Sequence, residues 1–157
     1  MNSGIIGLHK WDDRFLEMAR NISTWSKDPS TKVGAVVTDN DNRVISVGYN
    51  GFPKHEVDDN RLTDREVKYQ MIVHAERNAI EYAQMAHWDL KGCNLFTYPF
   101  IPCSICAEKI NKSGINRVVS LESDNERWNA DFQITRTLFQ NTEIELLEYP
   151  DYFFTWS

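Results

Sequence analysis

The chain of 157 residues has no long hydrophobic run and only three cysteines. No apolar stretch approaches the roughly 18 residues that a membrane-spanning helix requires, so we expect no membrane partner. Residues 1–10 lack the basic and then apolar pattern of a secretory signal peptide. Three cysteines cannot all pair in disulfides, and two of them, Cys103 and Cys106, have the spacing of metal ligands. We therefore expect a protein of the reducing cytoplasm.

An excess of positive charge is also missing. Seventeen basic residues stand against twenty-three acidic ones, and the formal net charge is −6. A protein that binds DNA or RNA regardless of sequence needs a basic surface to neutralise phosphates, so we expect no nucleic-acid polymer as a partner. A small anionic substrate is compatible with this composition, because about two or three local Lys or Arg side chains suffice for one phosphate.

Repeats and low-complexity segments are absent, and Gly and Pro are scattered singly. The length is that of one domain, and an apolar content of 41% is sufficient for an ordinary core. We therefore expect a single domain over residues 1–157.

Hydrophobic spacing predicts helices that alternate with single strands after an initial antiparallel hairpin. The predicted helices cover residues 11–26, 74–85, 103–113 and 125–139, and the predicted strands cover residues 33–38, 43–49, 93–98, 116–121 and 143–148. The first helix should bury one stripe, formed by Trp11, Phe15, Met18, Ala19, Ile22 and Trp25. Together these elements predict an α/β fold with a mixed sheet between helices. Residues 50–73 form a long polar segment of the kind that often serves as a lid or binding loop.

Two short motifs carry most of the functional information, His74-Ala75-Glu76 and Pro102-Cys103-Ser104-Ile105-Cys106. One imidazole and two thiolates suit a tetrahedral zinc ion whose fourth position is open. Glu76 is not spaced as a further ligand, but it could reach a water in that position and act as the catalytic general base.

Both motifs should lie at helix N-termini. Pro102 fits the first turn of a helix because it lacks an N–H, which places Cys103 and Cys106 on one face of an opening turn. A helix N-terminus also favours thiolates by lowering thiol pKa values. His74 and Glu76 can converge only in a first turn as well, since residues two apart within a helix point about 200° apart.

Three alternative roles for the cysteines each leave part of the pattern unexplained. A structural zinc site would need a fourth protein ligand, for which Cys93, His55 and His87 are the candidates. Cys93, however, has the position of a small core residue at the start of a strand, and both histidines lie in polar surroundings. A redox-active cysteine pair would leave His74 and Glu76 without a role, and an uncoordinated pair of thiols in a helix cap is the last alternative.

The sequence resembles the deoxycytidylate (dCMP) deaminases of the cytidine deaminase-like superfamily. Its two motifs match the His-x-Glu and Pro-Cys-x-x-Cys signature of zinc-dependent nucleobase deaminases. The similarity also includes residues 26–35 (SKDPSTKVGA), residues 48–53 (GYNGFP), and Lys68-Tyr69 ahead of residues 74–80. It spans roughly residues 11–121. The signature alone would leave cytosine, adenine and guanine deaminases open, and the upstream segments favour dCMP.

This resemblance implies a three-layer α/β/α sandwich around a five-stranded mixed sheet. It implies hydrolysis of dCMP to dUMP and ammonia, which feeds thymidylate synthesis. It also implies homo-oligomers, commonly hexamers, that dCTP activates and dTTP inhibits, often with Mg²⁺. The implied effector-binding residues are Asn50, Gly51, Phe52, Asp58 and Asp59. Residues 54–57 depart from the family, in which a Gly often follows the Pro of this stretch.

Contacts to the sugar and the phosphate are expected upstream of the metal motif. We assign Asn50 to the deoxyribose hydroxyl, the alternative being a simple Asn-Gly hairpin turn. Ser26, Lys27 and Thr31 are candidates for the 5′-phosphate, the alternative being a solvated helix end. Further cations that could join a phosphate or effector pocket, or simply be solvated, are Arg61, Arg65 and Lys68.

Contacts to the base are expected beside the metal motif. Backbone N–H groups around Ala75 and Ser104 could contact the base edge, and Phe100 or Tyr98 could pack on the pyrimidine face or merely belong to the core. Glu76 would take a proton from water, pass it to cytosine N3 and then protonate the departing ammonia.

Two rival functions follow from the same motifs. The nearest is deamination of a different base, such as free cytidine, guanine or a tRNA adenosine. A tRNA enzyme should have a basic surface, and an enzyme for free cytidine would have little use for phosphate donors. The second is a non-catalytic nucleotide-sensing protein that keeps zinc structurally, against which Glu76 and the unfilled fourth ligand position argue.

Overall fold

The structure is a computed structural model that describes residues 8–51 and 74–154. Its elements in chain order are α1 (Lys10–Ser23), β1 (Gly34–Thr38), β2 (Val44–Tyr49), α3 (Ala75–Met85), β3 (Asn94–Tyr98), α4 (Ser104–Ser113), β4 (Arg117–Leu121), α5 (Asn129–Asn141), β5 (Glu145–Tyr149) and the 3₁₀ turn η2 (Asp151–Phe153). The four helices and five strands whose ranges were predicted above are present, with shifted ends. In the described ranges no helix is long and apolar enough to cross a membrane.

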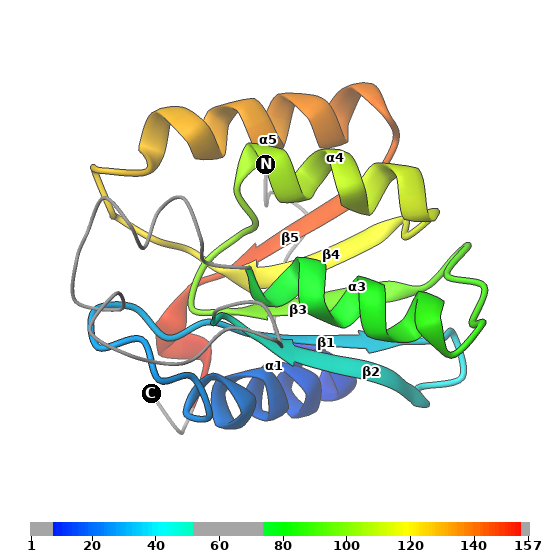
Figure 1. Cartoon of the computed structure of the whole chain (residues 1–157). Helices are drawn as coiled ribbons and strands as arrows, with labels where there is room; N and C mark the ends of the chain where they lie inside the picture. The colour runs from blue at the N-terminus through cyan, green and yellow to red at the C-terminus, as the bar shows by residue number, and fades with distance from the viewer. Residues whose placement is uncertain (1–7, 52–73, 155–157) are drawn as a thin grey trace.

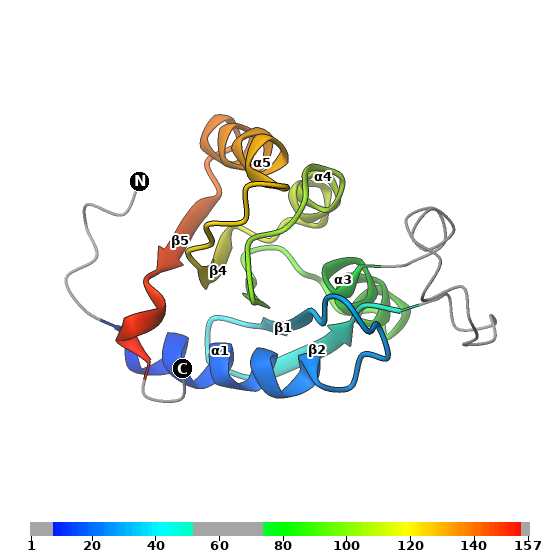
Figure 2. The ribbon, with the colours of Figure 1, turned by 90° about the vertical axis from the view of Figure 1, so that its left-hand side faces the viewer.

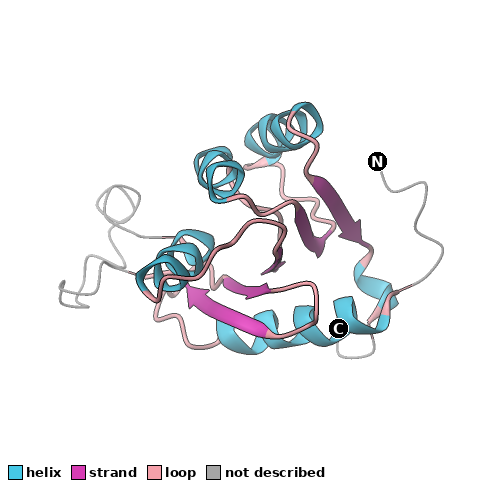
Figure 3. Cartoon of the chain, turned by 90° about the vertical axis from the view of Figure 1, so that its right-hand side faces the viewer, coloured by secondary structure: helices cyan, strands magenta, loops and turns pink. Residues whose placement is uncertain are grey.

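The strands form one mixed sheet in the order β2-β1-β3-β4-β5. β1 pairs antiparallel with β2 and with β3, whereas β3 with β4 and β4 with β5 are parallel. α1 covers one face of the sheet, and α3, α4 and α5 cover the other (Figures 1 and 2). Figure 3 shows the same three layers from the opposite side. The predicted hairpin, mixed sheet and α/β/α sandwich are thus confirmed.

Alternate residues of the central strands supply two separate cores, because successive side chains of a strand point to opposite faces. Val36 and Phe96 pack with α1, together with the fully buried Leu16. Ala35 and Leu95 pack on the other face with α3, α4 and α5.

The predicted buried stripe of the first helix was wrong at two positions. Met18 is 38% exposed, and Trp25 is 55% exposed. The helix ends at Ser23, so Trp25 no longer follows the helical spacing, and its ring meets Tyr49 edge-on at a centroid distance of 6.1 Å. Leu16 takes the inward position that the stripe had assigned to Met18.

The sheet brings segments that are distant in sequence to one edge. β2, β3 and β4 run in one direction and β1 in the other. Therefore the residues that follow β2, β3 and β4 lie beside those that precede β1. α3 and α4 also begin at this edge. Ligands of open α/β sheets characteristically bind outside the carboxyl ends of the strands, so this edge is the expected place for a site.

Candidate active site

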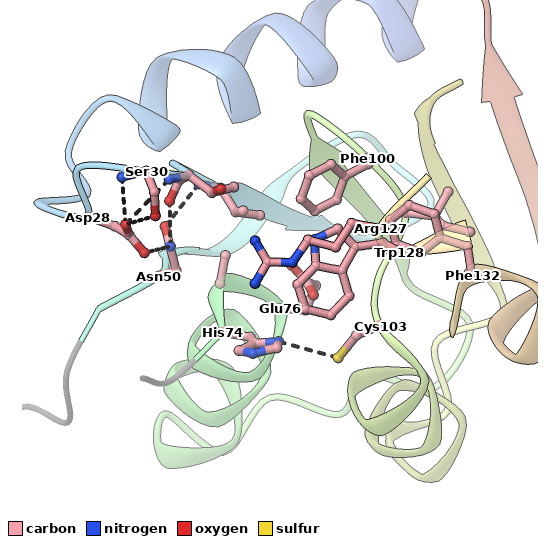
Figure 4. A pocket seen from close by; sticks show the side chains of 14 residues that line it. Asp28, Ser30, Asn50, His74, Glu76, Phe100, Cys103, Arg127, Trp128 and Phe132 are labelled. Carbon is pink, nitrogen blue, oxygen red and sulfur yellow. Dashed lines mark hydrogen bonds between the residues drawn. The ribbon is translucent and has the colours of Figure 1, made fainter. Parts of the chain in front are cut away.

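His74, Cys103 and Cys106 bring their side-chain donors together where α3 and α4 begin. His74 is the N-cap of α3, Cys103 is the N-cap of α4, and Cys106 lies in the first turn of α4. His74 Nδ1 is 3.3 Å from Cys103 Sγ and 3.4 Å from Cys106 Sγ. Figure 4 shows the imidazole and the Cys103 thiol pointing toward each other. The predicted convergence of the two motifs at helix starts is confirmed.

Pro102 has a different place from the one predicted. It precedes the N-cap instead of lying in the first turn, because Cys103 has extended backbone angles and the helix begins at Ser104. The Cys103 sulfur accepts the backbone N–H of Cys106 at 3.5 Å, so the thiol itself caps the helix.

The three donors fit a zinc ion. At ordinary bond lengths, the N and S ligands of a tetrahedral zinc lie about 3.6 Å apart, close to the distances from His74 to the two sulfurs. Within the described residues, the group of metal-ligating side chains has these three members, all within 4.8 Å of one another. Cys93 is directed elsewhere, toward the carbonyl oxygen of Asp89 at 3.8 Å, and His55 lies outside the described ranges. Among the described residues no fourth ligand joins the set, which therefore matches a zinc site whose fourth position is open.

The three donors also set one another's protonation. The hydrogen bond with Cys106, and to a smaller extent the hydrogen bond with His74, lowers the pKa of Cys103 to about 4. The hydrogen bond with Cys103 raises the pKa of His74 to about 9, and the hydrogen bond with Cys103 likewise raises the pKa of Cys106 above its ordinary value. Zinc binds neutral imidazole and thiolates, so metal binding must release protons from His74 and Cys106.

Glu76 lies beside these donors, in the first turn of α3. Its side chain is buried, and burial raises its pKa to about 7 against the opposing effect of the His74 charge. A carboxyl group whose pKa is close to neutrality can both accept and return a proton.

A pocket opens above the donors at the carboxyl edge of the sheet (Figure 4). Its walls come from the segment before β1, the ends of β2 and β3, the start of α3 and α4, and the connection between β4 and α5. The lining residues are Asp28, Ser30, Thr31, Val33, Asn50, His74, Ala75, Glu76, Phe100, Ile101, Cys103, Arg127, Trp128 and Phe132.

Asn50 lines this pocket, but its side chain also joins two segments of the wall. Its Oδ1 accepts the N–H of Val33 at 2.9 Å, and its Nδ2 donates to the carbonyl oxygen of Thr31 at 2.9 Å. Asn50 lies between β2 and a bridge residue at Gly51, so it is not part of a hairpin turn. The expected contact between Asn50 and a sugar hydroxyl stays a prediction.

The three residues predicted for the phosphate have different surroundings. Thr31 lines the pocket, whereas Ser26 and Lys27 do not. Ser26 is buried, and its hydroxyl donates to the carbonyl oxygen of Asn50 at 2.8 Å and accepts the N–H of Asp28 at 3.2 Å. Ser26 therefore holds the backbone of two wall residues from outside the pocket.

Some of the residues predicted to contact the base line the pocket, and others do not. Ala75 and Phe100 line the pocket, and the Phe100 ring packs on Phe132 at a centroid distance of 5.5 Å. Ser104 donates its backbone N–H and its hydroxyl to Asp131 at 2.9 and 2.6 Å, so both donors are directed to α5.

The implied effector residues fall mostly in a part of the chain that the structure does not describe. Gly51 is half-buried just after β2. The other predicted residues of this segment lie outside the described ranges, namely Phe52, Asp58, Asp59, Arg61, Arg65 and Lys68.

Sequence reasoning missed five polar or aromatic lining residues, Asp28, Ser30, Arg127, Trp128 and Phe132. Arg127 and Trp128 fell inside the predicted helix over 125–139, whereas α5 begins at Asn129. The position of this connection after a parallel strand is the signal that could have placed them at the site.

Comparison with known proteins was decisive for the family. Residues 9–122 match the family model described as the cytidine and deoxycytidylate deaminase zinc-binding region, a range that contains both motifs. The chain belongs to this deaminase family.

The deaminase is similar to several curated proteins. It is 43% identical over 147 residues to an uncharacterized deaminase in the luxG 3′ region of Aliivibrio fischeri, covering 91% of this chain and 96% of that protein. It is 34% identical over 137 residues to the deoxycytidylate deaminase of Mus musculus, covering 83% and 75% of the two chains. With a probable deoxycytidylate deaminase of Caenorhabditis elegans the identity is 40% over 121 residues, covering 74% of this chain and 60% of that protein.

A solved structure has the same fold. The dCMP deaminase from the cyanophage S-TIM5 superposes on the deaminase with a TM-score of 0.70 at 21% sequence identity, covering 87% of this chain and 95% of that one.

Proposed function

We propose that the deaminase hydrolyses dCMP to dUMP and ammonia and so supplies thymidylate synthesis. The observation that carries this proposal is the arrangement of three zinc-type donors beside the buried carboxyl group of Glu76. Two of the donors, His74 and Cys103, line a pocket together with Glu76. Support for dCMP as the substrate comes from the relatives named deoxycytidylate deaminases. A protein of the same fold has been crystallised with dCMP and dUMP.

In this proposal His74, Cys103 and Cys106 hold zinc, which supplies a Lewis acid that lowers the pKa of a coordinated water. The Glu76 carboxylate accepts the proton of the attacking water and delivers it to N3 of the cytosine ring. The hydroxide adds to C4 of the ring. Glu76 then takes the proton of the hydroxyl group on C4 and gives it to the amino group on the same carbon, so that the C4–N bond breaks and ammonia leaves. Phe100 provides an apolar wall against which the pyrimidine packs.

A substrate panel tests the proposal. Purified protein is incubated with dCMP, CMP, deoxycytidine and guanine, and ammonia release is measured. We expect the highest kcat/KM with dCMP, loss of activity with a chelator, and recovery on addition of zinc. Zinc-loaded protein that does not turn over dCMP, or that prefers guanine or the free nucleoside, would overturn the proposal.

We also propose that the deaminase forms homo-oligomers, with a hexamer as the expected state. Large apolar side chains are exposed on and just after α3, where Tyr82 is 45%, Met85 72% and Trp88 52% exposed, and on α4, where Ile105 is 80% exposed. Exposed apolar patches commonly mark contacts between proteins. Light scattering after size-exclusion chromatography should give a multiple of the chain mass, and a monomer at micromolar concentration would contradict the proposal.

Regulation by dCTP as activator and dTTP as inhibitor, with Mg²⁺, is proposed as well. It rests on the resemblance of residues 48–53 (GYNGFP) to the dCMP deaminases. Initial rates with each nucleotide, with and without Mg²⁺, test it, and rates that neither nucleotide changes would contradict it.

We place the enzyme in the cytoplasm. Cys103 and Cys106 must stay reduced to bind zinc, which a reducing compartment ensures. Fractionation of the host cell tests this placement.

A further inference from the structure

Among the lining residues that the structure describes, Arg127 is the one side chain with a permanent positive charge. It lies in the connection between β4 and α5, just before α5 begins. Its side chain extends across the pocket above Glu76, toward the wall that contains Asn50 (Figure 4). Arg127 is exposed as a residue, whereas Glu76 is 4% exposed, so we take Arg127 to mark the open side of the pocket and Glu76 to mark its floor.

The opposite wall is poorly suited to an anion. Ser30 donates both its backbone N–H and its hydroxyl to Asp28 Oδ1, each at 2.9 Å, and the N–H of Thr31 donates to the same oxygen at 3.3 Å. Asp28 is itself 2% exposed. These three donors are therefore directed to a carboxylate, and a carboxylate repels phosphate.

The orientation of a bound nucleotide follows from the position of the zinc donors. The amino group that is removed must lie near His74 and Glu76 at the floor. The 5′-phosphate is at the other end of the nucleotide and must therefore lie toward the open side of the pocket, where Arg127 is found. A guanidinium group offers a planar fork of N–H donors that matches phosphate oxygens.

Trp128 helps to hold this cation in place. The guanidinium carbon of Arg127 lies 5.4 Å from the centroid of the Trp128 ring, within the range of a cation–π interaction. Trp128 lines the same pocket, so the pair forms one charged and aromatic corner.

We propose that Arg127 binds the 5′-phosphate and makes the deaminase select nucleotides over nucleosides. This inference rests on the proposed function, because it takes dCMP as the substrate. It replaces the sequence-based expectation that Ser26, Lys27 and Thr31 provide the phosphate site.

The test compares two substrates that differ only in the phosphate. For Arg127→Ala we expect kcat/KM with dCMP to fall about tenfold to a hundredfold more than kcat/KM with deoxycytidine, as for loss of a charged hydrogen bond. Arg127→Lys keeps the charge but not the planar set of N–H donors. Its kcat/KM with dCMP, relative to deoxycytidine, should lie between that of wild type and that of Arg127→Ala. Arg43→Ala is the matched control, because Arg43 pairs with Asp39 in an exposed turn between β1 and β2 and does not line the pocket.

Binding of the product gives a readout that does not require turnover. Calorimetric titration should show a similar loss of affinity for dUMP in Arg127→Ala, with a smaller change for deoxyuridine. Circular dichroism checks the fold, and Arg127→Gln, which retains most of the side chain, serves if the Ala variant does not fold.

The outcomes separate the two proposals. If wild-type enzyme deaminates dCMP and the Arg127 variants lose equal activity on dCMP and deoxycytidine, the phosphate assignment is overturned. If wild-type enzyme does not deaminate dCMP, the proposed function fails. In that case, the dUMP and deoxyuridine titrations still decide whether Arg127 recognises a phosphate, with equal affinity losses counting against it.

Discussion

At the scale of single residues, Glu76 is held between opposing influences. Burial disfavours the charged form of its carboxyl group, whereas the positive charge of His74 and its own backbone N–H favour that form. Its place in the first turn of α3 adds the favourable end of the helix dipole. Burial prevails, and the pKa rises to about 7. The residue is therefore suited to carry a proton in both directions during one turnover.

Glu76→Gln should abolish turnover without loss of zinc. Glutamine has nearly the same shape as glutamate but cannot carry a proton, and general acid–base catalysis contributes about 10²- to 10⁴-fold. We expect kcat to fall by about a thousandfold, measured as ammonia release, with zinc content by elemental analysis unchanged. Glu81→Gln is the control, because Glu81 lies later on α3 and outside the pocket. A Glu76→Gln enzyme with full zinc and a near-normal rate would rule out the proton-transfer role.

Residues of the zinc site could be predicted because their pattern is local. His74 and Glu76 are two apart, Cys103 and Cys106 three apart, and each pair shares one helix start. The wall residues that lie between β4 and α5, Arg127 and Trp128, could not be found in this way. Whether Arg127 faces the pocket depends on the order of the strands, which no spacing in the sequence records.

At the scale of secondary-structure elements, α5 supports the cysteine segment from outside the pocket. Asp131 accepts the N–H and hydroxyl of Ser104 at 2.9 and 2.6 Å. Thr135 donates its hydroxyl to the carbonyl oxygen of Pro102 at 2.9 Å. These bonds fix the backbone on both sides of Cys103, and hence the direction of its thiol.

Asp131→Ala should therefore weaken zinc binding. Partners that orient metal ligands typically contribute about 10- to 100-fold to metal affinity, and we expect a loss in this range. Competition with a chromophoric chelator measures it. Asp124→Ala, at an exposed residue of the connection between β4 and α5, should leave the affinity unchanged. Equal zinc affinity in Asp131→Ala and wild type would show that α5 does not position the thiols.

The close contact between α3 and β2 gives another prediction. A Cβ atom at Gly48 would lie 2.4 Å from the carbonyl oxygen of Ala75 and 2.6 Å from the backbone nitrogen of Ala79. Gly48→Ala should push the start of α3 away from the sheet, and we expect a loss of about 3 kcal/mol in the free energy of unfolding, measured in urea. Gly51→Ala is the matched control, because, apart from its chain neighbours, no described residue lies within 4 Å of its Cβ position. Equal unfolding midpoints for the two variants would contradict this account.

Periodicity predicted the type of each element better than its ends. The stop of α4 was predictable, since Gly114 has a φ of 93°, a left-handed conformation that favours glycine. The start of α5 was not, because its N-cap, Trp128, is not a capping residue and its side chain makes no cap hydrogen bond. The two strands of the first hairpin were found because β-branched residues mark them.

At the scale of the whole molecule, one buried polar cluster joins the first helix to the last strands. Arg117 of β4 donates to both carboxylate oxygens of Asp12 in α1, at 2.9 and 2.8 Å, and to Glu145 of β5 at 2.8 Å. The hydroxyl of Tyr149 donates to Asp12 at 2.7 Å. Burial, and then this bond, raise the pKa of Tyr149. Asp12 is an acidic residue in the first turn of α1, and no local pattern connects it to partners that are 105 and 137 residues away.

Asp12→Ala should therefore destabilise the fold without changing the chemistry. It removes the partner of a half-buried guanidinium and of a buried phenol, and breaking a buried ion pair costs about 3 kcal/mol or more. Urea unfolding should show this loss, while kcat of the folded variant stays near that of wild type, since none of the four clustered residues lines the pocket. Glu17→Ala, at an exposed site on the same helix, should change neither the stability in urea nor kcat. A variant at Asp12 that keeps its stability would mean that packing of α1 alone, through Leu16 and its neighbours, closes this side of the sheet.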